Sequence, residues 1–250
     1  MQNMPFVMPI PYFLFLEEIN FHLKKPLDLV SLISLPIEHF FRSTFATTRH
    51  FKNYKILLFR VKVNEGETVL VHGASGAVGI ACIQLLQALV KSVKVIGTAG
   101  SADGLELVKK CGAQHVYNHR KATYMSEIQS DYPKGVDVIV EMLANENLDH
   151  DLSKLIGQNG RVLIVGARDN VTINPRSLMK KESSVHGVAL RAATAKETET
   201  AAADICSDKV AQFIDPAVDR SFSLAEADQA HVYVMESTGH KGKVVLSLNE

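Results

Sequence analysis

The sequence predicts an α/β fold with a doubly wound parallel sheet of about six strands, preceded by an irregular N-terminal segment. Two observations lead to this fold class. From Gly66 onward, short runs rich in β-branched residues alternate with helical patterns, which is the order of parallel strands joined by crossover helices. The runs are also almost continuously apolar, as strands are when helices cover both faces of their sheet.

The expected strands follow these apolar runs, and helices fill the intervals. The strands are Thr68–His72, Lys94–Gly97, His115–Tyr117, Val136–Glu141, Arg161–Val165 and Ser184–Val188. The helices are Ala77–Leu89, Ala102–Cys111, Tyr124–Ser130 and Leu148–Ile156; Gly112 and Gly157 end the second and fourth, and Gly160 opens the fifth strand. A helix at Leu224–Glu236 and a strand at Gly242–Leu248 follow. That strand has no evident partner, and an unpaired apolar edge favours aggregation.

The first 60 residues show no clear hydrophobic period. Their apolar stretches, separated by prolines and basic clusters, are Tyr12–Phe15, Leu29–Leu35 and Tyr54–Phe59. The run Met1–Leu16 is apolar, but it has no basic start, contains prolines and is followed by two glutamates, which argues against a cleaved signal peptide. No apolar run is long enough to cross a bilayer.

Composition narrows the classes of function. The chain has 250 residues with 27 basic and 27 acidic side chains, so its formal net charge is zero. This balance gives no general case for nucleic acid or an anionic membrane as a partner, although a local basic patch remains open. The cysteines Cys82, Cys111 and Cys206 are odd in number and far apart. They predict neither a disulfide framework nor a metal site, and they fit a reducing cytoplasm.

The most informative motif is the glycine-rich turn Gly73-x-x-Gly76-x-x-Gly79 between the first strand and the first helix. Such a turn directs the N–H groups of a helix N-terminus at an anion, here the pyrophosphate of a dinucleotide. Gly76 is expected to let the pyrophosphate approach the backbone, and Gly79 to let the helix pack closely on the strand. The expected contacts are Ser75, Gly76, Ala77, Val78 and Gly79. The alternative is that the glycines serve packing alone.

The end of the second strand favours NADP(H) over NAD(H). NAD-binding domains usually place an acidic residue there, which accepts a hydrogen bond from the ribose 2′-hydroxyl and would repel a 2′-phosphate. Here the strand runs into Gly100-Ser101, with no carboxylate. Asp103 is a possible ribose ligand, but it fits better as an acid in the first turn of the next helix. His119-Arg120-Lys121 either brings positive charge to the 2′-phosphate or forms a solvated loop.

Several further motifs occur in one order from about Val61 to the C-terminus. They are Val69–Gly79, Gly97–Gly100, Val116–Arg120, Glu141–Asn145 with Asn147, Gly160–Gly166, Ile173–Arg176 and Lys181–Ser184. Through them the chain resembles the zeta-crystallin-like quinone oxidoreductases of the medium-chain dehydrogenase/reductase superfamily. The stretches Glu-Met-Leu-Ala-Asn and Tyr-Asn-His-Arg point to this family in particular, rather than to the superfamily at large.

The resemblance implies a Rossmann domain that binds NADP(H) and reduces quinones, ortho-quinones above all, without zinc. It also implies a cytoplasmic homotetramer and, in some relatives, binding of AU-rich RNA. The implied cofactor contacts are Ser75–Val78, Gly100, His119, Asn147, Val165, Gly166, Ala167, Gly187, Val188 and Ala189. They follow the carboxyl ends of strands, where an open parallel sheet binds its ligand. Asn147 equally fits the N-cap of the helix expected at Leu148, and Gly166 equally fits a turn.

Three regions follow from the resemblance: a divergent remnant of unknown fold over 1–60, an NADP-binding Rossmann domain over 61–222, and a helix and strand over 223–250 that return to the catalytic domain in the family. Relatives carry a GroES-like domain before the Rossmann domain, which walls the substrate cleft and supplies an aromatic side chain. Residues 1–60 lack its motifs, and Tyr12 cannot be assigned as that aromatic residue. No catalytic residue or metal ligand is identified.

The leading hypothesis is therefore an NADPH-dependent quinone reductase. One alternative is a non-catalytic NADPH-binding module that senses the cofactor or binds RNA. Its candidate basic patch consists of Arg120, Lys180, Lys181 and Arg191, which are equally expected to form a solvated surface. Another is a shortened chain that does not fold to an active state.

Overall fold

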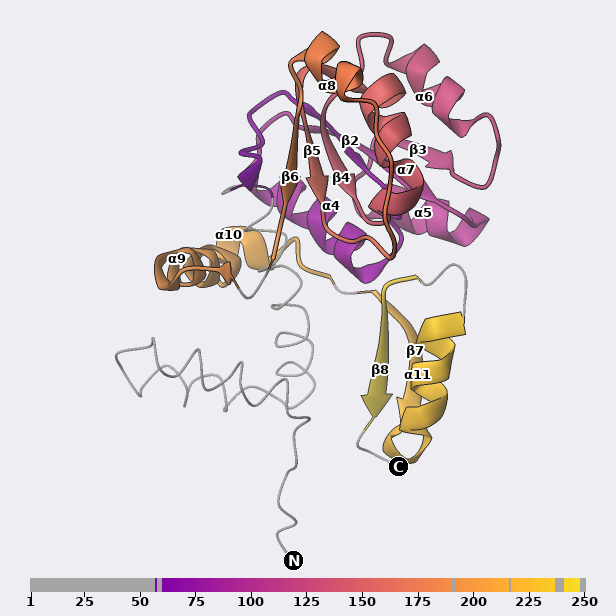
Figure 1. Ribbon diagram of the computed structural model, residues 1–250. Coiled ribbons are helices and arrows are strands. Elements are labelled where there is room, and N and C mark those ends of the chain that lie inside the picture. The colour runs from indigo at the N-terminus through magenta and orange to yellow at the C-terminus, as the bar shows by residue number, and fades with distance from the viewer. Residues whose placement is uncertain (1–56, 58–59, 190–191, 216, 237–240, 248–250) are drawn as a thin grey trace, which may run out of the picture.

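The computed structural model describes residues 57, 60–189, 192–215, 217–236 and 241–247. The expectations for Met1–Leu16, for Tyr12 and for almost all of the region 1–60 lie outside these residues, as does Arg191. The described part contains a six-stranded sheet with helices on both faces and a smaller two-stranded unit (Figure 1). This confirms the fold class predicted from the sequence.

All strands of the large sheet run parallel, in the order β3-β2-β1-β4-β5-β6. Their bounds are β1 Thr68–Val71, β2 Lys94–Ala99, β3 His115–Asn118, β4 Val136–Glu141, β5 Ile156–Ile164 and β6 Ser184–Gly187. The chain first builds outward from β1 to β3 and then crosses to β4 on the other side of β1. In such sheets ligands bind outside the carboxyl ends of the strands at this change of direction.

Helices connect the strands across both faces of the sheet (Figure 1). They are α4 Ala77–Leu89, α5 Ala102–Lys110, α6 Tyr124–Asp131, α7 Ala144–His150, the π-helical turn η2 Asp151–Leu155, and α8 Pro175–Lys181. The bounds of α4 agree with the sequence prediction at both ends. The start of α5 is fixed by the Ser101 hydroxyl, which accepts a hydrogen bond from Gly104 N at 3.1 Å.

The helix after β4 differs from the prediction. It begins at Ala144 rather than at Leu148, and η2 continues it. Ala144 N donates to the Gly166 carbonyl at 3.0 Å, a long-range bond that turns the chain into the helix soon after β4 ends. Asn147 therefore lies inside α7, and its alternative role as the helix N-cap is wrong.

The start of β5 also differs, because this strand begins at Ile156 rather than at Gly160 or Arg161. The β4–β5 register shifts along this stretch, which marks a bulge. Gly157 does not end a helix. A Cβ on Gly135 would lie 2.6 Å from Gly157 N, so these glycines allow two backbones to approach at the start of the strands.

Alternate residues of β1 point into two apolar layers. Val69 and Val71 belong to the layer that contains α4 and the side chain of Val108 from α5. Leu70 belongs to the layer on the other face, with Ile128 from α6. The helices α9 Ala195–Ile205 and α10 Asp208–Ala211 close the first layer. Because both faces are used for packing, a ligand has to be held by the loops that follow the strands.

A smaller unit at the C-terminal end contains β7 Val218–Ser223, the 3-10 turn η4 Leu224–Glu226, α11 Ala227–Glu236 and β8 Lys243–Ser247. β8 pairs in parallel with β7, so the expectation that the last strand lacks a partner is wrong. We did not predict β7 from the sequence, because Val218-Asp-Arg-Ser-Phe-Ser contains no apolar run. The expected boundary between 222 and 223 falls at the end of β7, and the division into regions stays a prediction.

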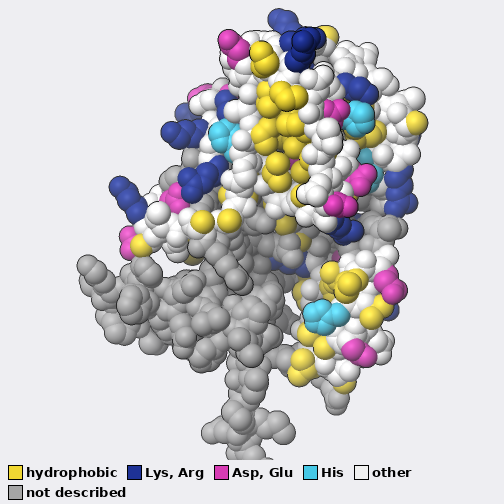
Figure 2. Space-filling view, in the orientation of Figure 1, with side chains coloured by type: hydrophobic (Ala, Val, Ile, Leu, Met, Phe, Trp, Pro, Cys, Tyr) yellow, Lys and Arg dark blue, Asp and Glu magenta, His cyan; other side chains and the backbone are white. Residues whose placement is uncertain are grey.

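Hydrophobic side chains lie at the surface of this small unit (Figure 2). They are Val218, Leu224, Val232, Val234, Met235 and Leu246, which are between 41% and 83% exposed. An apolar surface of this kind is typical of a region that contacts another protein surface. Among the described helices, none combines the length and the apolar character that a membrane crossing requires.

Candidate cofactor site

The glycine-rich turn joins β1 to α4 and is fastened to the neighbouring strand. Gly73 has φ +57°, a left-handed conformation that favours glycine. Its N–H donates to the Thr98 hydroxyl at 3.1 Å, and Ala74 N–H donates to the Thr98 carbonyl at 2.7 Å. Thr98 is fully buried in β2. The turn is therefore held in place by the sheet as well as by its own sequence.

Gly76 and Gly79 have different surroundings. A Cβ on Gly79 would lie 2.5 Å from Ala74 Cα, so α4 can approach the turn this closely only with glycine at that position. A Cβ on Gly76 would meet only the Gly73 carbonyl oxygen, at 3.4 Å, which is an ordinary contact. Packing explains Gly79, as the sequence predicted, but it gives no reason for glycine at position 76.

Gly76 is the N-cap residue of α4, and this end of the helix is suited to binding an anion. Gly76 has no side chain to cap the helix, and the first turn of α4 contains no acidic residue. The N–H groups and the dipole at a helix N-terminus favour negative charge. The predicted contacts Ser75 to Gly79 thus lie together around this helix start.

Two basic side chains lie where β2 and β3 end. A Cβ on Gly100 would be 2.8 Å from His119 Nε2 and 2.9 Å from Arg120 Nε. His119 Nδ1 is 3.4 Å from the Thr98 hydroxyl that also holds the glycine turn. Partial burial lowers the pKa of His119, because it disfavours the charged imidazolium, and the positive charges of His72 and Arg120 lower it further. The structure therefore brings Gly100, His119 and Arg120 together beside the turn.

Asp103 does not stand at the end of β2. It lies in the first turn of α5, where its carboxylate accepts a hydrogen bond from Lys241 Nζ at 2.8 Å. This ion pair lowers the pKa of Asp103. The placement agrees with the interpretation of Asp103 as a first-turn acid.

Glu141, the last residue of β4, orients the side chain of Asn147. Glu141 is fully buried, and its Oε1 accepts hydrogen bonds from Leu143 N at 2.5 Å and from Asn147 Nδ2 at 3.2 Å. Asn147 is half-buried at the carboxyl end of β4. A predicted cofactor contact is thus held by a buried carboxyl group.

The other oxygen of Glu141 faces a buried cluster. His72 Nε2 lies 3.0 Å from Asp151 Oδ1 and 3.7 Å from Glu141 Oε2, and all three residues are buried. Burial, the largest single effect, lowers the pKa of His72, but the charge and the hydrogen bond of Asp151 and the charge of Glu141 together raise it above its ordinary value. Burial raises the pKa of Glu141 to about 7; Asp151 acts in the same direction and His72 in the opposite one.

The remaining predicted residues follow β5 and β6. Val165 N donates to the Glu141 carbonyl at 2.9 Å, and Val188 N donates to the Ile164 carbonyl at 3.3 Å. A Cβ on Gly166 would lie 2.7 Å from the Met142 carbonyl oxygen, so this glycine has a packing role. The others, Ala167, Gly187 and Ala189, are exposed. All predicted contacts thus lie at or just beyond the carboxyl ends of strands in the one parallel sheet.

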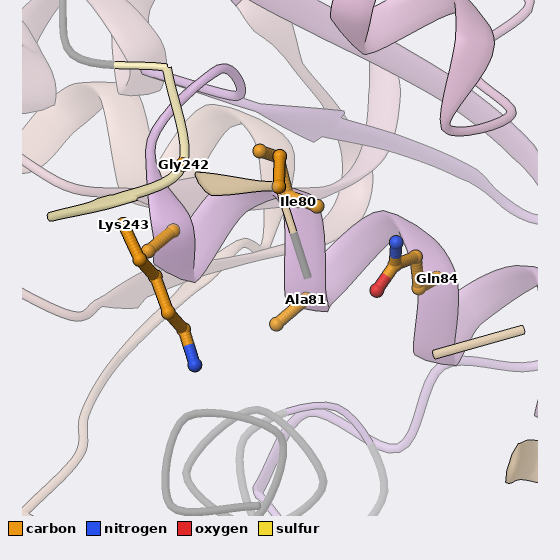
Figure 3. A pocket seen from close by; sticks show the side chains of 7 residues that line it. Ile80, Ala81, Gln84, Gly242 and Lys243 are labelled. Carbon is orange, nitrogen blue, oxygen red and sulfur yellow. The ribbon is translucent and has the colours of Figure 1, made fainter. Parts of the chain in front are cut away.

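The segment before β8 contacts the glycine turn. Gly242 N donates to the Ser75 carbonyl at 2.9 Å, next to a bridge between Gly76 and Gly242. A small cavity of about 10 Å³ lies nearby, between this segment and α4 (Figure 3). It is lined by Ala77, Ile80, Ala81, Gln84, Ala217, Gly242 and Lys243. That volume suits one water molecule at most, so this cavity is not a cofactor pocket.

The described residues do not form a catalytic zinc site. The one group of three or more His, Cys, Asp or Glu side chains found among them with potential ligand atoms within 4.8 Å of one another is His72, Glu141 and Asp151. A catalytic zinc needs a position open to substrate, and these side chains are at most 4% exposed. Cys82, Cys111 and Cys206 are free thiols outside that group.

The described members of the candidate basic patch, Arg120, Lys180 and Lys181, do not form one surface in the structure. Arg120 follows β3, whereas Lys180 and Lys181 lie in α8, immediately before β6. β3 and β6 are the opposite edges of the six-stranded sheet. Lys181 Nζ also donates to the Ile156 carbonyl at 2.6 Å, so it stabilises the chain locally.

Two residues of the site were not predicted from the sequence, namely His72 and Asp151, and Glu141 was noted only as part of a motif. A signal was present for Glu141, because this carboxylate directly follows the apolar run Val138–Val140 and was therefore expected to be buried. His72 likewise ends a buried run. Asp151 gave no signal, because it lies in a segment that reads as an ordinary helix.

The strand order, with a glycine-rich turn after β1, defines the Rossmann class of α/β domains. Residues 77–208 match the family described as "Zinc-binding dehydrogenase", and the chain belongs to this family. It is 42% identical over 202 residues to "Quinone oxidoreductase" from Mus musculus and 40% identical over 200 residues to "Quinone oxidoreductase" from Homo sapiens. Both matches cover 80% of this chain and 60% of the relative, which confirms the resemblance inferred from the motifs.

Solved structures agree with these matches. The quinone oxidoreductase from Thermus thermophilus, described with its NADPH complex, is 25% identical with a TM-score of 0.69, and the match covers 80% of this chain and 64% of that one. The structure described as AibC is 30% identical with a TM-score of 0.66, covering 82% and 59%. The chain thus spans about 60% of the length of the relatives that it matches.

Proposed function

We propose that this chain binds NADPH at the glycine-rich turn and contributes the cofactor domain of a quinone reductase. One observation carries the proposal: Gly76 opens α4 without a capping side chain, at a position where packing does not require glycine. Close approach of a pyrophosphate to the backbone there would explain why this position is glycine. The remaining predicted contacts follow the neighbouring strands.

The preference for NADPH over NADH rests on the ends of β2 and β3. His119 and Arg120 lie against Gly100, where a ribose 2′-phosphate would be expected to bind. Asp103, the nearest carboxylate in sequence, is paired with Lys241 in α5. Arginine suits phosphate because its planar group donates several hydrogen bonds in a fixed geometry.

The bound cofactor would supply the hydride for reduction. The chain's own residues would hold the pyrophosphate, orient the nicotinamide half through the loops after β4, β5 and β6, and exclude water. Quinones are the proposed substrates because the relatives carry that name. We also propose that the reaction needs no zinc, as the resemblance to the zeta-crystallin-like quinone oxidoreductases implies. A cytoplasmic location and a homotetramer stay predictions.

Calorimetry with NADPH and NADH tests the binding proposal. We expect NADPH to bind more tightly than NADH, and the Arg120→Ala variant to lose most of that difference. Lys121→Ala is the matched control, because it removes a neighbouring positive charge that is not seen against Gly100. Equal affinities for NADPH and NADH in the unaltered protein would refute the NADP assignment.

Reduction of an ortho-quinone with NADPH separates an enzyme from a binding module. Turnover by the purified chain would support the reductase. Tight NADPH binding without turnover would favour the non-catalytic module. The RNA alternative gains no support from the described members of the candidate basic patch, because Arg120 lies by one edge of the sheet and Lys180 and Lys181 by the other. Salt-dependent retention of AU-rich RNA in a filter assay would revive it.

A further inference from the structure

Glu141 connects the Asn147 amide to the buried pair His72–Asp151. We infer that Glu141 is the positioning residue for Asn147, and that uptake or release of a proton by Glu141, in its cluster with His72 and Asp151, changes how firmly Asn147 is held for the cofactor. The role of Asn147 toward a cofactor rests on the proposed function. The link from Glu141 to Asn147 is a property of the protein alone.

An ionised Glu141 gives the Asn147 amide one orientation. A carboxylate can only accept hydrogen bonds, so Asn147 must turn its Nδ2 toward Glu141 Oε1, at 3.2 Å. Its carbonyl oxygen is then turned the other way and remains an acceptor at the carboxyl end of β4. A neutral Glu141 holds Nδ2 less strongly, because hydrogen bonds to charged groups are about twice as strong as neutral ones.

The cluster has a place for the proton. Glu141 Oε2 and Asp151 Oδ2 are buried acceptors without a hydrogen-bond partner among the described residues. A proton taken up from solvent by Glu141 forms an O–H that can donate to Asp151 and so serves both oxygens. With His72 charged, this also removes the net negative charge of the buried group. Burial, the largest cause, raises the pKa of Glu141 to about 7, so Glu141 takes up and releases this proton near neutral pH.

Other titratable groups also face the cluster. Tyr124 of α6 has its pKa raised to about 12 by burial and by the charges of Asp151 and Glu141, so it stays protonated at neutral pH. His119, at the end of β3, senses the charge of His72, and its pKa is lowered. The variant Glu141→Gln distinguishes the titration of Glu141 from that of these neighbouring groups, because glutamine keeps the shape of the neutral acid and does not titrate.

Nuclear magnetic resonance of the cofactor-free protein tests the positioning directly. The side-chain amide signal of Asn147 would be followed from about pH 5.5 to about pH 8.5, a range that brackets the pKa of Glu141. We expect a shift with a midpoint near pH 7 in the unaltered protein and no such shift in Glu141→Gln. Glu146→Gln, an exposed change in the same helix, should titrate like the unaltered protein. A signal that titrates equally in Glu141→Gln overturns the inference.

NADPH affinity at about pH 8 tests whether Glu141 acts through Asn147. Glu141→Gln should weaken binding about three- to tenfold, as expected when a charge-assisted hydrogen bond becomes neutral. Added to Asn147→Ala, it should cause no further loss. Independent, additive losses would contradict the coupling, and tighter binding by Glu141→Gln would show that the buried charge merely repels the cofactor. If the unaltered protein does not bind NADPH, the proposed function fails, while the resonance experiment still decides the positioning.

Discussion

Gly76 and Gly79 offer a sharp test, because one alanine at each should damage a different property. An alanine at position 79 would place its Cβ 2.5 to 2.8 Å from three backbone atoms of Ala74. Carbon atoms in contact normally lie about 3.5 to 4.0 Å apart, so the helix or the turn must move by about 1 Å. Overpacking of this kind costs about 1 to 3 kcal/mol of folding free energy.

At position 76 the expected change in stability is near zero. The backbone there has φ −74° and ψ 162°, which alanine adopts without strain, and its Cβ would meet one oxygen at 3.4 Å. Replacing glycine stabilises by about 0.4 to 1 kcal/mol through the unfolded chain. Alanine is a poorer N-cap than glycine, which offsets this gain. The added methyl group does, however, stand where the pyrophosphate is proposed to approach.

The two variants are compared by urea unfolding and by NADPH binding. Unfolding is followed by circular dichroism, since the chain contains no tryptophan. Gly79→Ala should lower the urea midpoint, whereas Gly76→Ala should keep the midpoint and weaken NADPH binding at least about tenfold, or about 1.4 kcal/mol. An unchanged midpoint in Gly79→Ala would refute the packing argument. Unchanged affinity in Gly76→Ala would refute the pyrophosphate assignment.

Three further outcomes follow from charge and burial. Arg120→Ala should weaken NADPH binding by about 1.5 to 3 kcal/mol and leave NADH binding unchanged, as calorimetry would show. Burial raises the pKa of Glu67, but hydrogen bonds from Asn64 and Arg161 lower it by more, so its contribution is present at neutral pH and lost in acid. Glu67→Gln should therefore lower the free energy of unfolding by about 1 kcal/mol at pH 7, and urea titrations should show this difference shrink as the pH falls below the ordinary pKa of glutamate, about 4.3. Burial also raises the pKa of the Cys82 thiol, so a thiol reagent should label Cys82 only as the protein unfolds; rapid labelling of native protein would contradict this.

The sequence was sufficient to predict the six strands and the turn because these elements have local causes. The run Val138–Val140 is continuously apolar and β-branched, as expected for a strand covered on both faces. The glycines of the turn mark its conformation by themselves. The bounds of α4 were predicted correctly because the turn precedes it and the apolar pattern ends at Leu89.

The elements that the sequence missed depend on contacts between distant residues. α7 begins early because Ala144 bonds to Gly166, and neither residue reveals the other. β7 is mostly polar and becomes a strand through pairing with β8. The cluster of His72, Glu141 and Asp151 joins three segments, so no spacing rule could have found it. The structure places Asn147 at this edge, and its contact with a cofactor stays a prediction; the group that orients it was not predicted.

The hydrogen bond from Gly242 to the Ser75 carbonyl has a practical use. The amide proton of Gly242 is held by the turn that we propose grips the pyrophosphate. Its rate of exchange with heavy water is therefore a reporter of that turn, read from a residue outside the proposed contacts. Slower exchange on addition of NADPH would indicate that occupancy of the turn tightens the attachment of the whole C-terminal unit.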